Sequence, residues 1–272
     1  MPTFNTNVNA IQVQNALTQN NMALTKTMGE LSSGLRVNAA ADDAASLAIG
    51  NQMAARIVSL NQAVRNANDG ISMMQTADGA TKVMADLLAR MRELAIQASS
   101  DTYGTTDRDA LNTEFGELKS AMSSIVQDTS WNGKKLLNGD NLSATYQVGA
   151  SGVGTDGVSV SFSNLSSLTV LTATGLSNRT DAQTVMTSAE ADLTTINNAR
   201  ATWGAAMNRL SYAADNSGNV SLNLSASKSR LVDADYAKAT ADLARAQIIE
   251  AAGTAMLSQA NQQGVMVLHL LR

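Results

Sequence analysis

The sequence predicts a mainly α-helical protein of long antiparallel helices: a terminal coiled-coil pair plus a helical bundle, with a small β-hairpin region at the tip. Proline occurs once in 272 residues, as Pro2, so no proline ring interrupts a long helix. Aromatic residues make up only 3% of the chain, which favours helices packed through Ala, Leu, Met and Gly over one thick core. Both ends of the chain are amphipathic and poor in charge, whereas an ordinary surface helix carries charges on its solvent side.

The C-terminal end, residues 225–272, is predicted to form a single helix about 70 Å long. Its apolar residues recur at steps of three or four, which places them on one face of the helix. No Asp, Glu, Lys or Arg lies between Glu250 and Arg272, and Ser, Gln and Asn fill the positions off that face. We therefore expect other chains to cover this helix.

The N-terminal end has the same character. No charged residue occurs from Met1 to Thr25, and leucines recur every seven residues along the predicted helix. Assembly of the terminal helices, with each other or with further copies, is expected to use Leu17, Leu24, Met28, Leu31 and Leu35 from one end and Leu243, Ile249, Met256, Leu257, Val267 and Leu271 from the other. Two interpretations remain open: an ordinary antiparallel pair inside one globular domain, or an assembly element that needs further copies.

Between the ends, the periodicity of the apolar residues predicts three more helices. The N-terminal helix is expected at residues 5–33, and the three helices that follow it are expected at 42–99, 107–128 and 181–213. Gly34 is expected to end the first helix, and the carboxylates of Asp42 and Asp43 to cap the start of the second. Residues 215–219 are expected to break the chain before the terminal helix.

The stretch 136–170 has a different pattern. Tyr146 and Val148, and then Val158 and Val160, alternate with small polar residues across a glycine-rich connection, which predicts a β-hairpin. We therefore expect two domains: a terminal helical domain of residues 1–41 with 225–272, and a helical domain of residues 42–224 that contains the hairpin.

Composition argues against several classes of function. The net charge of −4 is too weak to indicate a nucleic-acid partner, and no run of about 20 apolar residues predicts a membrane span. The absence of cysteine rules out disulfide and thiol chemistry, and the N-terminus lacks the pattern of a cleavable secretory signal.

Catalytic and metal-binding motifs are also missing. His269 is the single histidine and has no Cys or His partner for a metal ion. The glycines between Gly149 and Gly157 lack the Lys and Ser/Thr of a phosphate-binding loop. Asp233 and Asp235 are expected to point to different sides of a helix, which disfavours a metal site. We expect no enzyme activity and no cofactor.

Six stretches, in the right order, resemble bacterial flagellin and together cover nearly the whole chain. Those in the N-terminal half are Leu31–Arg36 with Asp42–Ala45, Asn66–Ile71, Arg92–Gln97 and Trp131–Lys134. Those in the C-terminal half are Thr195–Arg200 and Arg245–Gln262, and the end Val267–Arg272 is similar too. Trp203 departs from the pattern, which has a smaller aliphatic residue at that position.

The resemblance implies a structural subunit that polymerises into the flagellar filament outside the cell and serves swimming motility. It implies that the terminal helices line an inner tube, that the middle of the chain forms the next shell, and that large outer domains are missing. It also implies export through the flagellar type III channel, a chaperone on the C-terminal helix, and contacts with cap and junction proteins. Another secreted helical filament or a surface adhesin is the alternative.

The resemblance further implies a site that the Toll-like receptor for flagellin reads. Its candidate residues are Arg90, Arg92, Glu93, Leu94, Gln97 and Glu114. Arg90, Leu94 and Gln97 lie at helical steps and are expected to share one face, with Leu94 as the apolar centre. The same residues are also candidates for contact with a neighbouring subunit in the filament.

Overall fold

The computed structural model describes residues 6–140, 143–150 and 156–270, with the side chains of 263–270 excepted. The chain divides into two compact units: unit one holds the residues up to Ala55 and from Asn223 onward, and unit two holds Arg56–Leu222. The helices are α1 Val8–Ser33, α2 Ala44–Ala98, α3 Thr105–Asp128, α4 Thr169–Thr172, α5 Arg179–Val232 and α6 Tyr236–Leu270. The strands are β1 Ser130–Trp131, β2 Lys134–Lys135, β3 Ser143–Gln147 and β4 Gly157–Ser161.

The predicted class, long helices with a small β region, is confirmed. Several element ends are also where the local signals placed them. Gly34, at φ +72°, closes α1, and the Asp43 carboxylate accepts a hydrogen bond from the Ser46 N–H at 2.9 Å to cap α2. Asp42 does not cap α2 as predicted, because its carboxylate accepts from the N–H groups of Asn38 and Ala39 in the preceding connector. The start expected for the first helix at residue 5 lies outside the described residues; α1 begins at Val8, capped by the side chain of Asn7.

The predicted end of the fourth helix was wrong. Helix α5 continues through residues 215–219, which were expected to form a break, and ends only at Val232. Ser217 in this stretch, and Ser221 one turn further along, are buried contact residues and not loop residues. The Ser217 hydroxyl donates to the carbonyl of Val148 at 3.1 Å, and the Ser221 hydroxyl donates to Asn61 Oδ1 at 2.9 Å.

The break before the terminal helix lies instead at Asp233–Asp235, so this helix begins at Tyr236 and not at residue 225. The Asp235 carboxylate accepts hydrogen bonds from the backbone N–H groups of Ala237 and Lys238 at 3.0 and 3.2 Å, which caps α6. Asp233 and Asp235 therefore belong to a turn, and the expectation that they lie on a helix was wrong.

A backbone clasp within unit one stabilises this turn. Leu35, just after α1, and Asp233, just after α5, form a single antiparallel β-bridge. The N–H of Arg36 donates to the carbonyl of Val232 at 2.7 Å, and the N–H of Ala234 donates to that of Gly34 at 2.9 Å. Two segments about 200 residues apart thus satisfy each other's backbone groups.

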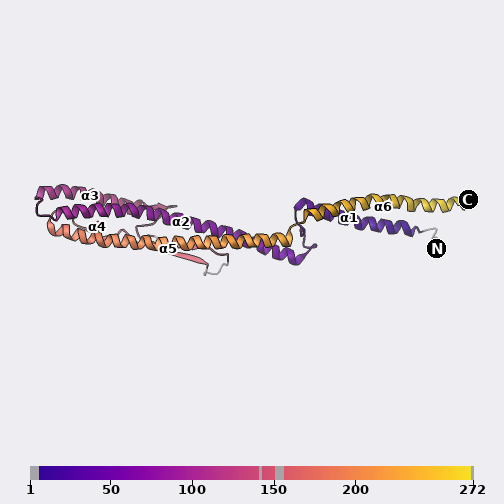
Figure 1. The fold of residues 1–272 in the computed structure, drawn as a ribbon, viewed down its shortest axis with the longest axis horizontal. Helices are drawn as coiled ribbons and strands as arrows, with labels where there is room; N and C mark the ends of the chain where they lie inside the picture. Colours follow the sequence, from indigo (N-terminus) through magenta and orange to yellow (C-terminus); the bar gives the residue numbers. More distant parts are fainter. Residues whose placement is uncertain (1–5, 141–142, 151–155, 271–272) are drawn as a thin grey trace. The chain divides into compact units, whose positions relative to one another are not determined.

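In unit two, α2, α3 and α5 run side by side around the main core (Figure 1). Its fully buried large side chains come from all three helices and from the segments around the hairpin: Trp203, Phe115, Met74, Met84, Leu88, Met91, Leu94, Met122, Leu136, Leu137, Leu165 and Leu176. The indole N–H of Trp203 donates to the carbonyl of Ser161 at 3.0 Å, and its ring lies 5.9 Å from that of Phe162. Trp203 therefore anchors the hairpin on α5.

The hairpin of β3 and β4 is antiparallel, with Ala144 opposite Val160 and Tyr146 opposite Val158. Its expected place at the tip was wrong. The ring of Tyr146 packs over Gly70, in the middle of α2, and its hydroxyl donates to the sulfur of Met73 at 2.9 Å. The hairpin lies along the helices because its apolar face needs a long helical surface to cover it.

The turn predicted at Trp131–Gly133 is confirmed. It joins β1 and β2, and its two central residues, Asn132 and Gly133, have φ values of +47° and +77°. This is the conformation that makes Asn-Gly the preferred pair for a tight hairpin turn. Among the described residues, no helix has both the length and the hydropathy needed to cross a bilayer.

Candidate functional site

The first candidate surface is the terminal pair, the name used here for α1 and α6 in unit one. The side-chain amide of Asn20 donates to the carbonyl of Ala246 at 2.8 Å, and that of Asn7 donates to the carbonyl of Ala260 at 2.9 Å. The earlier of the two amides, that of Asn7 at the start of α1, pairs with the later residue of α6, Ala260, so the two helices run antiparallel.

Gly253 allows a close approach of the two helices within the pair. A Cβ atom on this glycine would lie 2.7 Å from Cδ2 of Leu17, which is too close for two carbon atoms. Two amide side chains and one glycine therefore define the register of the pair, which large apolar side chains alone would leave loose.

The residues predicted for assembly of the terminal helices fall into groups that differ in burial. Those that are half-buried are Leu17, Leu24, Leu31, Leu35, Leu243 and Leu257. Leu17, Leu24 and Leu31 follow one another at seven residues along α1, whereas Leu35 lies beyond it in the clasp. The side chain of Val267 and the whole of Leu271 lie outside the described residues.

Three of these residues lie outside the seam between α1 and α6, and their role in assembly stays a prediction. Met28, Ile249 and Met256 are 56%, 47% and 60% exposed. The alternate positions of the α1 seam hold Val13, Asn20 and Thr27, one residue earlier than predicted. The polar residue Asn20 lies inside because its amide bonds to α6, a contact that hydrophobic periodicity does not detect.

The outer faces of the terminal pair carry most of its large apolar side chains. Helix α1 has no fully buried residue. The exposed large apolar residues of the pair are Val8, Ile11, Met22, Met28, Tyr236, Ile248, Ile249 and Met256. Met22 also lines an open groove of about 630 Å³ between α1 and the connector at residues 38–42, where Lys26 pairs with Asp42 at 3.3 Å. One copy alone leaves this apolar surface in water, which is typical of an interaction surface.

The second candidate surface, in unit two, is the α2–α3 patch, defined here as Arg90, Glu93, Gln97 and Glu114. Arg90 donates through Nε and Nη2 to one carboxylate oxygen of Glu114, at 2.9 and 2.7 Å, and through Nη1 to Glu93 at 3.1 Å. These hydrogen bonds, that of Glu114 first, raise the pKa of Arg90, so the group stays charged. The amide of Gln97 donates to the hydroxyl of Tyr103 at 3.1 Å.

Leu94 does not form the apolar centre of this patch, so that part of the prediction was wrong. Its side chain is 1% exposed and belongs to the core of unit two, on the same stripe of α2 as Met91 and Ala98. Helical spacing placed Leu94 near Arg90 and Gln97 correctly, but the side of α2 that carries Leu94 faces the core of unit two.

Arg92 lies at the border of the patch and does not share its ion pairs. It pairs with Glu190 on α5 at 3.7 Å, whereas Arg90 pairs with Glu114 on α3. The residue that sequence reasoning missed is Ile96, which is 47% exposed on α2. Ile96 lies four residues after Arg92 and outside the apolar face that holds Met91 and Leu94, so its spacing could have indicated an exposed position.

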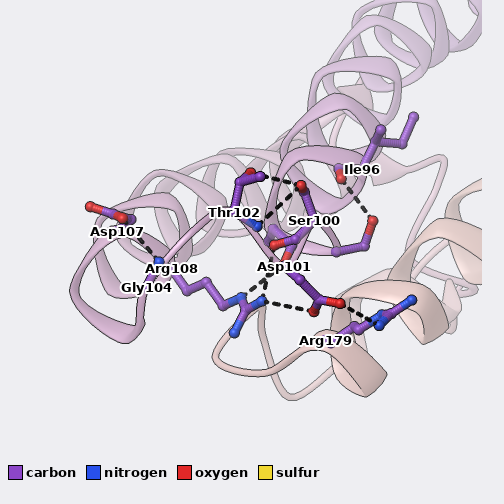
Figure 2. A network of polar contacts seen from close by, with 10 residues as sticks. Ile96, Ser100, Asp101, Thr102, Gly104, Asp107, Arg108 and Arg179 are labelled. Carbon is purple, nitrogen blue, oxygen red and sulfur yellow. Dashed lines mark hydrogen bonds and ion pairs between the residues drawn. The ribbon is translucent and has the colours of Figure 1, made fainter.

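A polar network holds the loop that follows α2 (Figure 2). Asp101 lies between two guanidinium groups, 2.7 Å from Arg179 and 3.9 Å from Arg108. Arg108 also donates to the carbonyls of Ala98 and Ser100 at 2.9 and 3.0 Å, and so satisfies groups that the end of α2 leaves free. This network ties together α2, α3 and α5 at one end of unit two.

In the described part of the chain, no three His, Cys, Asp or Glu side chains are grouped as metal ligands would be. What the structure offers instead is two helical surfaces, one apolar and one charged. They define a structural protein that acts through contacts between helices. Residues 4–142 match the bacterial flagellin N-terminal helical region, and residues 186–271 match the bacterial flagellin C-terminal helical region. The chain belongs to the bacterial flagellin family.

Individual proteins similar to this chain are flagellins as well. The chain is 42% identical to a flagellin of Halalkalibacterium halodurans over 248 residues, which is 91% of each chain. It is 36% identical to a flagellin of Bacillus subtilis over 99% of each chain. A crystal structure of Bacillus cereus flagellin superposes with a TM-score of 0.52 at 32% identity, covering 56% of this chain and 88% of that one. The protein is a structural subunit of the flagellar filament, an extracellular appendage for motility, and it polymerises with itself.

Proposed function

We propose that polymerisation buries the outer faces of the terminal pair against further copies of the chain. In this proposal the domain of residues 1–41 with 225–272 lines the inner tube of the filament, and residues 42–224 form the shell around it. The observation that carries the proposal is the exposure of Met22, Ile248 and Met256, at 67%, 69% and 60%, on helices that have few charges. Burial of such side chains drives association, and their surroundings add no unpaired charge to an interface.

Deletion of residues 233–272 tests this proposal, because it removes α6 at the turn where the helix begins. The shortened chain should remain soluble, keep the helical signal of unit two and form no filament in seeded polymerisation. A narrower test replaces two outer-face residues, Ile249→Gln with Met256→Gln, and compares the result with Gln259→Ala, an exposed polar position on α6. Loss of filaments in the double variant alone supports the proposal, whereas normal filaments from that variant contradict it.

We also propose that the α2–α3 patch, with Arg92 and Ile96 at its border, contacts a neighbouring subunit in the filament and the Toll-like receptor for flagellin in the monomer. An exposed arginine in a network of carboxylates beside an exposed isoleucine has the composition of an interface hot spot and its polar rim. A surface that is buried between subunits is accessible only in the monomer. Monomer should therefore bind the receptor ectodomain and filament should not.

Arg90→Ala and Ile96→Ala are the variants that test the patch, since both side chains are exposed and neither belongs to the core. Each should weaken receptor binding by about 1–2 kcal/mol if it makes a central contact. Arg209→Ala, an exposed arginine on α5, is the matched control. Wild-type binding by both patch variants would remove this surface from the receptor interaction.

A third part of the proposal concerns export. The chain is proposed to pass unfolded through the flagellar type III channel, guided by its N-terminal region, with a chaperone on the C-terminal helix and cap and junction proteins at the filament. The absence of cysteines and of buried residues in α1 supports it, because nothing cross-links the chain and its first helix has little to unfold. Secretion should stop in cells that lack the flagellar export apparatus. Secretion that continues in those cells would contradict the proposal.

A further inference from the structure

The methionines of this chain are divided between two environments. Of the 13, the three that are well exposed among the described side chains all lie on the terminal pair: Met22, Met28 and Met256, at 67%, 56% and 60%. The buried ones all lie in the core of unit two: Met73, Met74, Met84, Met91 and Met122. Met53, Met186 and Met207 are half-buried. An oxidant in water therefore reaches the terminal pair first.

We propose that Met22, Met28 and Met256 form an oxidation site through which peroxide switches off polymerisation of the monomer. This inference rests on the proposed role of the outer faces in the filament. In the reaction, a lone pair of the thioether sulfur attacks one oxygen of hydrogen peroxide. The S–O bond forms, the O–O bond breaks, and the other oxygen leaves as water after proton transfer. The sulfur loses two electrons and becomes a sulfoxide, and the peroxide is reduced.

The positions of the three sulfurs explain why assembly is affected and the fold is not. Met22 lines the groove beside α1, and Met28 and Met256 lie outside the seam between the two helices. A sulfoxide at these places is hydrated in the monomer and disturbs no internal contact. In the filament it would be buried as a polar oxygen on an apolar face, which is unfavourable without a hydrogen-bond donor. The core methionines of unit two stay reduced because water and oxidant do not reach them.

The experiment treats full-length monomer with hydrogen peroxide, maps sulfoxides by mass spectrometry of peptides, and measures seeded polymerisation. We expect oxidation first at the three exposed sites, with the helical signal unchanged and the critical concentration raised about tenfold, as burial of an unpaired polar group would do. Methionine sulfoxide reductase should restore polymerisation. The critical concentration of the triple variant M22L/M28L/M256L should be the same before and after this treatment, whatever its starting value, whereas that of the matched control M53L/M186L/M207L should rise on treatment.

A second measurement requires no variant. Partly oxidised wild-type chain is polymerised, and the peptide maps of the filaments and of the unassembled fraction are compared. Sulfoxide at the three sites should be enriched in the unassembled fraction. Enrichment elsewhere, or equal distribution between the fractions, overturns the inference, as does a triple variant that peroxide still inactivates. Untreated chain that forms no filament contradicts the proposed function itself, and the inference falls with it.

Discussion

At the scale of single residues, two glycines of α2 have opposite roles. A Cβ atom at Gly70 would lie 2.8 Å from the ring of Tyr146 and 3.0 Å from Leu210, whereas a Cβ at Gly79 would meet nothing within 4 Å. Gly70 is therefore needed for the close approach of the hairpin. Gly79 only weakens the helix, as glycine does in any helix interior.

Alanine at these two positions should change stability in opposite directions. Gly79→Ala should raise the free energy of unfolding by up to about 1 kcal/mol, because alanine restricts the unfolded chain. Gly70→Ala should lower it by about 1–3 kcal/mol, because the added methyl group displaces the Tyr146 ring. Urea unfolding followed by circular dichroism measures both, and stabilisation by Gly70→Ala would contradict the packing described here.

Leu94 and Ile96 form a second pair with different environments, 1% and 47% exposed on the same turn of α2. Leu94→Ala should destabilise unit two by about 2–5 kcal/mol, because it leaves a cavity in the core. Ile96→Ala should change stability by less than about 0.5 kcal/mol. The same unfolding experiment separates them, and equal effects would show that the two environments are not as described. Any effect of Leu94→Ala on receptor binding would act through the fold and not through contact.

At the scale of elements, Asp43 stabilises the start of α2 and Asp42 stabilises the connector that precedes it. The pKa of Asp43 is lowered from its ordinary value of 3.8, first by the hydroxyl and then by the N–H of Ser46. The pKa of Asp42 is lowered too, first by the backbone N–H groups of Ala39 and Asn38 and then by Lys26. Because both values are depressed by folding, the stabilisation is present above pH 3.8 and is lost as the pH falls through the lowered values.

Substitution at Asp43 should therefore show a particular pH dependence. Asp43→Ala removes the cap and should lower the melting temperature at pH 7 by roughly 2–4 °C. Asp43→Asn keeps an acceptor without a titrating group, so it should lose less stability than the wild type between pH 5 and about pH 3. Thermal melts at the two pH values measure the difference. An acid sensitivity of Asp43→Asn equal to that of the wild type would show that Asp43 does not contribute to it.

At the scale of the whole molecule, the two units should differ in local stability. Unit two has a core of fully buried side chains, whereas α1 has none. Regions with few buried contacts open more readily and exchange their amide hydrogens faster. In monomer, α1 and α6 should exchange much faster than the helices of unit two, and in filament they should become protected. Amide exchange with mass spectrometry measures both states, and equal protection of α1 and α6 in monomer and filament would contradict their role in assembly.

The sequence by itself determined the features that depend on neighbouring residues or on long motifs. The cap at Asp43, the end of α1 at Gly34 and the Asn132–Gly133 turn all follow from the chemistry of adjacent positions. The family was visible because six motifs occurred in order along the chain. Among the candidate site residues, the surface position of Arg90, Gln97 and Glu114 was predictable, since charged and amide side chains on predicted helices remain at the surface, and their role in a contact stays a prediction.

Only the tertiary structure decided which face of each helix meets a partner. Met28 and Thr27 differ by one residue in the heptad, and the hydrogen bond from Asn20 to Ala246 turns α1 so that Thr27 faces inward. In the same way, residues 215–219 have the composition of a loop but remain helical in α5, where Ser217 bonds to Val148. Leu94 is buried in the core that α2 shares with α3 and α5. The physical reason is the same in each case: burial and polar pairing depend on groups that are distant in sequence, and local periodicity contains no record of them.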